Sequence, residues 1–369
     1  MAAPKDGTMN SEEKYMSPAA ASSYCRDTSE LDDEQRRLAE EVRGLLRERI
    51  RAAGPAASWC RDGRVVFWGV CLASLDEDET AHGLCGDALL FKFLQSRDMN
   101  SAAACEMIVT SAAWRLSFGA DALNGADARE EDKRYAAYFD TTDFIFVKNI
   151  GTSNLDRGGR PIVVHRFGVF NDTDAWTHAF NYTTTTTTGD AHSTGNAHAA
   201  GADAEERVED VHDVSDAYTI YPGGERFIRW RIALMEKCVD LMDLESMERS
   251  SVSFVHDLRG LPYALVFQRA ARATVARLIS LLNDNYPEMA AKHIIVFGPY
   301  FLQLILTLLQ PFISPQTKEK FAIIPSNGST ADALIDELGD GLSPEYLEDV
   351  RAFEKKNGAG DATSWWWPW

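Results

Sequence analysis

Three groups of residues in the sequence could carry chemistry. His256 and Asp257 are adjacent and could act as an acid–base pair, but no G-x-S-x-G motif, P-loop or G-x-G-x-x-G accompanies them. The six cysteines form no C-x-x-C pair and have no histidine at zinc-finger spacing, which favours reduced thiols in a cytosolic protein. Four histidines lie in one acidic stretch without regular ligand spacing: His178, His192, His198 and His212. These patterns argue against catalysis and leave a binding function as the better interpretation.

Composition narrows the class of partner. The chain has 369 residues, of which 45% are hydrophobic, enough for one large domain with extensions or for two lobes. A net charge of −19 argues against nucleic acid as a partner, because neutralising phosphates needs clustered Lys and Arg. We expect no signal peptide or myristoyl group, because the N-terminus lacks an apolar core and has Ala2 after the first Met. The best candidate for a membrane span, Ile294 to Leu309, is interrupted by Gly298 and Pro299.

The N-terminal part of the sequence predicts a helical lobe. Residues 1–28 are rich in Ala, Ser and charge and are expected to be disordered. Apolar residues at helical spacing then predict helices after Leu31, after Asp87, between Ser101 and Gly119, and from Glu131 to Phe139. Together they indicate an all-α lobe over residues 29–140. The first helix could pack on the body of the protein or bind a partner.

The remainder of the chain alternates strands and helices. A hairpin is expected from 144–147 and 161–166, around the turn NLDRGGRP. Strands at 252–256, 293–297 and 321–324 are separated by helical stretches, which predicts a largely parallel sheet. Residues 171–224 hold six consecutive threonines, many acids and a single basic residue, Arg207, which predicts a disordered acidic insertion. A metal-binding loop is the alternative for this stretch.

One predicted helix, Tyr300 to Leu309, is apolar on nearly every face. Its polar residues, Gln303 and Thr307, lie one turn apart on a single stripe. A helix of this kind has to be buried or has to cover something apolar. By pattern alone it is a core helix, and a lid over an apolar ligand is the alternative.

The segments around this helix resemble the CRAL-TRIO domain, shared by phosphatidylinositol-transfer and tocopherol- or retinal-binding proteins. The resemblance is carried by NYPE (285–288), the strand ending in Pro299, the apolar helix and PFI-x-P-x-T-x-x-K (311–320). FIRWRIALMEK and HDLRGL are most similar to the plant patellins. It implies an α/β fold over 141–348, a mixed, mostly parallel sheet flooring an apolar lipid pocket with a mobile gate helix. The sequence departs from the patellin pattern in two ways. It has no match to the GOLD domain that follows in patellins, and the closing motif LP-x-x-YGG of the family reads LSPEYLED here.

The resemblance also implies positions for the ligand. Residues that contribute to the headgroup end in phosphatidylinositol-transfer members match Arg97, Glu288, Thr317 and Lys320. Arg97 and Lys320 would offer charge to a phosphodiester, and Glu288 could pair with Lys320 and orient it or form a structural ion pair. The pocket and gate would be lined by Phe254, Phe297, Tyr300, Phe301, Leu304, Ile305, Leu308 and Phe312. A bound phospholipid is implied as the ligand, with no metal and no other cofactor.

The implied function is the binding and transfer of phosphatidylinositol or a phosphoinositide, by a cytoplasmic protein that contacts membranes transiently. One alternative is a lipid-loaded regulatory scaffold that senses lipid, and another is a carrier of a neutral ligand such as a tocopherol-like isoprenoid. Residues 349–369 end in WWWPW, which could dock on the body, enter a membrane interface or bind a partner protein. A protein partner could also bind the first helix or the acidic stretch.

Overall fold

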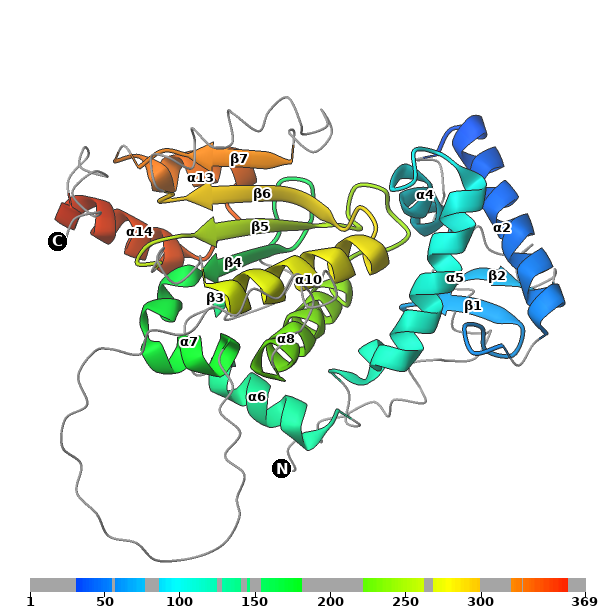
Figure 1. Ribbon diagram of the computed structural model, residues 1–369. Coiled ribbons are helices and arrows are strands. Elements are labelled where there is room, and N and C mark those ends of the chain that lie inside the picture. Colours follow the sequence, from blue (N-terminus) through cyan, green and yellow to red (C-terminus); the bar gives the residue numbers. More distant parts are fainter. Residues whose placement is uncertain are drawn as a thin grey trace, which may run out of the picture.

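The computed structural model describes residues 31–54, 57–76, 86–124, 128–140, 145–146, 154–180, 222–261, 268–298, 320–326 and 328–357. These residues form an N-terminal lobe and a larger lobe built on a β-sheet, side by side in Figure 1. The predicted disorder of residues 1–28 and the alternatives for the C-terminal tryptophans lie outside the described residues.

The N-terminal lobe packs three helices on a small hairpin. The helices are α2 (Asp33–Ala53), α4 (Asp87–Gln95) and α5 (Ser101–Phe118). α2 begins at a capping box formed by Asp32 and Gln35, and α5 begins at Asn100 and ends at Gly119 in the left-handed conformation. The strands β1 (Arg64–Phe67) and β2 (Val70–Ser74) pair antiparallel, so the prediction of an all-α lobe was wrong in this detail.

The hairpin has an unusual turn. Trp68 and Gly69 both have positive φ, 50° and 83°, as the type I′ class of two-residue hairpin turn requires. Asn-Gly or Asp-Gly normally marks such a turn in a sequence, whereas Trp-Gly does not. Trp68 holds the strained position because its indole nitrogen donates to the Glu236 carboxylate at 3.1 and 3.2 Å.

The larger lobe contains a five-stranded sheet in the order β3-β4-β5-β6-β7. The short strand β3 is antiparallel to β4, and the other neighbours are parallel. This confirms the predicted hairpin and the mixed, mostly parallel sheet. The strands are β3 (Ile145–Phe146), β4 (Ile162–Arg166), β5 (Val252–Asp257), β6 (Ala290–Val296) and β7 (Phe321–Ile324).

Helices cover both faces of the sheet (Figure 1). α13 (Thr330–Leu338) and α14 (Pro344–Asn357) pack on one face, where Val255 and Ile294 are fully buried. The other face is approached by α8 (Pro222–Val239) and α10 (Arg269–Asn285), and α6 (Glu130–Asp140) and α7 (Thr173–Phe180) contact α8. Residues of these four helices and of the N-terminal lobe share one continuous core.

α7 corrects the predicted start of the acidic insertion. Residues 167–171 form a 3-10 turn and Thr173–Phe180 a helix, whose Trp176, Ala179 and Phe180 are buried. The Trp176 indole donates to the Gln268 side chain at 3.2 Å, which ties α7 to the start of α10. Residues 181–221, with the threonine run and three of the four histidines, lie outside the described residues.

Candidate functional site

The site is built on the sheet face that α8 and α10 approach, which we call the pocket face. Aromatic and imidazole rings from four parallel strands stack across it: His165 on Phe254 at 5.4 Å, Phe254 on His293 at 5.4 Å, and His293 on Phe321 at 5.0 Å between ring centroids. Exposure rises along this row, because His165 is 2% exposed and Phe321 is 42% exposed. Among the described residues, the pocket face is thus closed at β4 and more open at β7.

Three of the side chains on the pocket face are histidines. His256 Nε2 and His293 Nδ1 lie 3.0 Å apart, at hydrogen-bonding distance, and Arg231 of α8 donates to His165 Nε2 at 3.3 Å. Burial lowers the pKa of His256 to about 3 and that of His293 to about 4, and it holds the pKa of His165 well below its usual value. All three rings are therefore neutral at physiological pH and act as hydrogen-bonding groups.

One end of the pocket face carries the polar pair expected from the sequence. Lys320, just before β7, forms an ion pair with Glu288, just before β6, which confirms the predicted pairing. Lys320 also accepts a 2.6 Å hydrogen bond at its carbonyl from the His293 backbone, so the pair lies next to the row of rings. We call Glu288, Lys320 and the neighbouring Lys92 the polar end.

Lys92 was missed by sequence reasoning. It is 3% exposed on α4, and its Nζ donates to the Glu288 carbonyl at 2.9 Å. Burial lowers the pKa of Lys92 to about 8, and the charge of Lys320 acts in the same direction. A lone lysine inside the apolar run DALLFKFLQ was the available signal, because a buried charge needs a partner.

The other predicted site residues are placed differently. Arg97 follows α4 and donates to the neighbouring Ser96 carbonyl at 2.8 Å. Phe254 lies on the pocket face as expected. Phe297 packs instead on Phe353 of α14, at 5.1 Å between ring centroids, which corrects its assignment to the pocket. Thr317 and the gate residues lie outside the described residues: Tyr300, Phe301, Leu304, Ile305, Leu308 and Phe312.

Phe297 leaves the pocket face because the chain turns at the end of β6. Strict alternation would place it beside His293 and Ile295, but its φ of 54° breaks the alternation. The Arg259 guanidinium lies 5.0 Å from its ring centroid and helps to fix it on the opposite side of the sheet.

A second glutamate, Glu236 of α8, joins the two lobes. Arg115 of α5 donates to both of its carboxylate oxygens, at 2.9 and 2.8 Å, and the indole of Trp68 and the hydroxyl of Tyr286 donate to it as well. Glu236 is 8% exposed and Arg115 4% exposed. The opposite charge of Glu236 raises the pKa of Arg115 against the effect of its burial. The tyrosine of NYPE therefore belongs to the lobe interface, whereas the glutamate belongs to the polar end.

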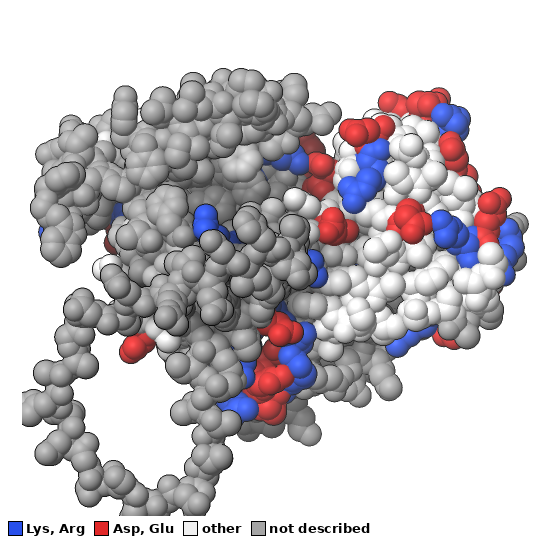
Figure 2. Space-filling view, viewed as in Figure 1, with Lys and Arg blue, Asp and Glu red and all other residues white. Residues whose placement is uncertain are grey.

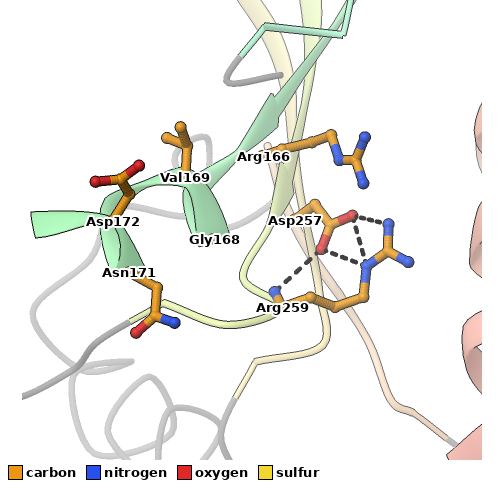
Figure 3. Close-up of a pocket in the computed structure, with 7 residues that line it drawn as sticks. All are labelled: Arg166, Gly168, Val169, Asn171, Asp172, Asp257 and Arg259. Atoms are coloured by element: carbon orange, nitrogen blue, oxygen red, sulfur yellow. Dashed lines mark hydrogen bonds and ion pairs between the residues drawn. The ribbon is translucent and has the colours of Figure 1, made fainter. Parts of the chain in front are cut away.

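A cavity of about 620 Å³ lies at the carboxyl ends of β4 and β5, at the other end of the sheet (Figure 3). The two arginines of its lining are paired, because Arg259 holds the buried Asp257 and both Arg259 and Arg166 reach Asp349 of α14. Asp257 also accepts from the Tyr346 hydroxyl at 3.1 Å, whereas His256 contacts His293. The neighbouring His256 and Asp257 thus face opposite sides of the sheet and form no acid–base pair.

Charges on the N-terminal lobe are mixed. Figure 2 shows acidic and basic side chains interspersed over its coloured surface. Arg37 pairs with Glu34, and Arg49 pairs with Glu106. Within the described ranges, no three His, Cys, Asp or Glu side chains are placed to hold a metal ion. Nor is any helix in that part of the chain long and apolar enough to cross a bilayer.

A family model and a solved structure both agree with this architecture. The family model of the CRAL/TRIO domain matches residues 148–348. The chain belongs to the CRAL/TRIO domain family. The solved structure of Sfh5 superposes with a TM-score of 0.52 at 14% sequence identity, covering 89% of this chain and 99% of that one, and it supports the fold.

Relatives of this CRAL/TRIO protein include patellins. Patellin-6 of Arabidopsis thaliana is 25% identical over 307 residues, which cover 83% of this chain and 57% of that protein. Patellin-3 of the same plant is 24% identical over 84% of this chain and 50% of its own length. The phosphatidylinositol transfer protein SFH5 of Scheffersomyces stipitis is 29% identical over 33% of this chain and 38% of its own length. The matched part of the chain thus covers little more than half the length of Patellin-6 and half or less of the length of the other two proteins.

Proposed function

We propose that this CRAL/TRIO protein holds a phospholipid on the pocket face, with the headgroup at the polar end, and exchanges it between membranes. Phosphatidylinositol or a phosphoinositide is the favoured cargo. The observation that carries the proposal is the Lys320–Glu288 pair beside an aromatic sheet face. The local similarity to a protein named as a phosphatidylinositol transfer protein supports the choice of headgroup.

The polar end has properties that suit a phosphodiester. The side chains of Lys320 and Glu288 are 29% and 33% exposed, so a ligand can reach them. A phosphate can replace the carboxylate of Glu288 as the partner of Lys320, because both offer anionic oxygens to an ammonium group. Lys92 adds a second positive charge behind this pair, although its ammonium is buried.

Lipid exchange also follows from the energetics of acyl chains. Two chains contain about 30 methylenes, and burial of each contributes about 0.8 kcal/mol, so transfer from water is worth about 25 kcal/mol in total. A bilayer supplies nearly the same free energy. A carrier therefore has to enclose the chains, and it releases one lipid most readily where a second lipid or the membrane takes its place.

A vesicle-to-vesicle assay tests this proposal. Donor vesicles of phosphatidylcholine with labelled phosphatidylinositol are mixed with unlabelled acceptor vesicles, with and without the full chain. We expect the chain to accelerate transfer of the labelled lipid. A chain that binds the lipid without accelerating transfer would instead be a lipid-loaded scaffold, and a chain that binds neither phospholipid would overturn the proposal.

A further inference from the structure

The pocket face is not a purely apolar lining. His256 and His293 are half-buried and share one hydrogen bond between His256 Nε2 and His293 Nδ1. Within the described residues, the remaining ring nitrogens, His256 Nδ1 and His293 Nε2, make no hydrogen bond. A neutral imidazole has one donor and one acceptor nitrogen, so each of these two nitrogens still has hydrogen-bonding capacity.

The pair offers one donor and one acceptor in either tautomeric arrangement. If His256 Nε2 donates, then His293 Nε2 carries a proton and His256 Nδ1 is an acceptor; if His293 Nδ1 donates, the roles are reversed. A saturated alkyl chain covering these nitrogens would remove their water and return no hydrogen bond, which is unfavourable. A hydroxyl oxygen can both donate and accept, and a carbonyl oxygen can accept.

We infer that the cargo carries a hydroxyl or carbonyl oxygen on its hydrocarbon part, which hydrogen-bonds to the His256–His293 pair. This inference rests on the proposed function, because it requires lipid on the pocket face. It narrows the cargo from a phospholipid with plain acyl chains to one with an oxygenated chain. The backbone hydrogen bond between His293 and Lys320 places the histidine pair close to the polar end. One lipid can therefore contact Lys320 with its headgroup and the histidine pair with an oxygen on its chain.

Extraction from vesicles tests the inference. The probes are phosphatidylinositol with two stearoyl chains and a positional series of the same lipid with one hydroxyl on the second chain, each in phosphatidylcholine vesicles. The full chain is separated from the vesicles, and its bound lipid is quantified by mass spectrometry. We expect at least one hydroxylated isomer to be extracted about 10-fold better than the parent, as for one satisfied buried hydrogen bond.

Two variants test whether the preference for the hydroxylated lipid depends on the His256–His293 pair. His256→Leu with His293→Leu should abolish the preference and leave extraction of the parent lipid equal or improved. His178→Leu is the matched control, because that imidazole packs on Tyr135 and Tyr138 of α6. His293→Leu alone is used if the double variant does not fold, and a folded variant that keeps the preference contradicts the inference.

The outcomes separate the inference from the proposed function. Equal extraction of the parent and of every isomer by the unmodified chain would overturn the inference and leave phospholipid carriage intact. Failure to extract any of these lipids would overturn the proposed function and the inference with it.

Discussion

Two glutamates in this protein bind cations in opposite ways. Glu236 is 8% exposed and accepts hydrogen bonds from Arg115, Trp68 and Tyr286. The Glu288 side chain is 33% exposed and its carboxylate contacts Lys320. The first carboxylate is saturated and cannot exchange partners without leaving a buried charge behind, whereas the second can give up its lysine to another anion. The difference distinguishes an ion pair that holds the lobes together from one that is suited to a ligand.

The two sites are connected by a short piece of chain. Tyr286 and Glu288 are two residues apart, and the Glu288 carbonyl accepts from Lys92 of the N-terminal lobe. The backbone at Glu288 has a φ of 52°, so the chain turns there, just before β6 begins, and the Glu288 side chain reaches Lys320. The turn that presents Glu288 thus contacts the N-terminal lobe at two points, through the ring of Tyr286 on Trp68 and Trp114 and through Lys92.

The largest expected effect is on stability at the buried site. Glu236→Ala removes the bidentate partner of the buried Arg115 and leaves it only the half-exposed Asp121, so the free energy of unfolding should fall by about 3 kcal/mol. Glu288→Ala is the matched variant and should cost less than about 1 kcal/mol, as for an exposed pair. Urea unfolding followed by circular dichroism measures both. Equal losses in the two variants would remove the distinction between the sites.

The next effect is on headgroup selectivity at the exposed site. Lys320→Ala should slow phosphatidylinositol transfer about 10-fold, the loss of one charge-assisted hydrogen bond, and should affect phosphatidylcholine transfer much less. Lys292→Ala is the control, because Lys292 pairs with Glu337 of α13. If Lys320→Ala reduced both lipids equally, Lys320 would have a structural role only.

A pH effect is expected from Lys92. Burial lowers its pKa to about 8 in the folded chain from the ordinary 10.5 of a lysine, so the folded state binds fewer protons than the unfolded state between these values. The Lys92 contribution to stability therefore rises with pH across this window, by up to about 3 kcal/mol. The free energy of unfolding of the unmodified chain, minus that of Lys92→Met, should increase from pH 8 to pH 10.5. A constant difference would show that Lys92 titrates normally.

The smallest effect is expected at Arg97. Its observed hydrogen bond is to the adjacent Ser96 carbonyl, so any contribution to the headgroup acts from a partly exposed position. Arg97→Ala should slow phosphatidylinositol transfer by about 3-fold or less. A loss as large as that for Lys320→Ala would place Arg97 in the polar end.

The sequence predicted the elements better than it predicted the neighbours of each side chain. Periodicity was sufficient for α2, α5, α8 and the parallel strands, and the motifs NYPE and T-x-x-K pointed to the ion pair between Glu288 and Lys320. α7 was missed because TDAWTHAF is short and precedes an acidic, threonine-rich stretch. Phe297 was misplaced because alternation does not reveal a positive φ at the end of a strand.

The contacts among the histidines on the pocket face could not be predicted from the sequence for a different reason. His165, His256 and His293 are far apart in the sequence, and each alone resembles an ordinary strand residue. They meet because the register pairs His165 with His256 and places His293 diagonally across from His256. Register between parallel strands depends on the helices that connect them, so a single sequence did not provide it.

The most direct test of the central claim is native mass spectrometry of the full chain, before and after incubation with vesicles containing phosphatidylinositol. We expect that a phospholipid co-purifies with the chain and is replaced by phosphatidylinositol during incubation. A folded chain that is purified without lipid and takes up none from the vesicles would contradict it.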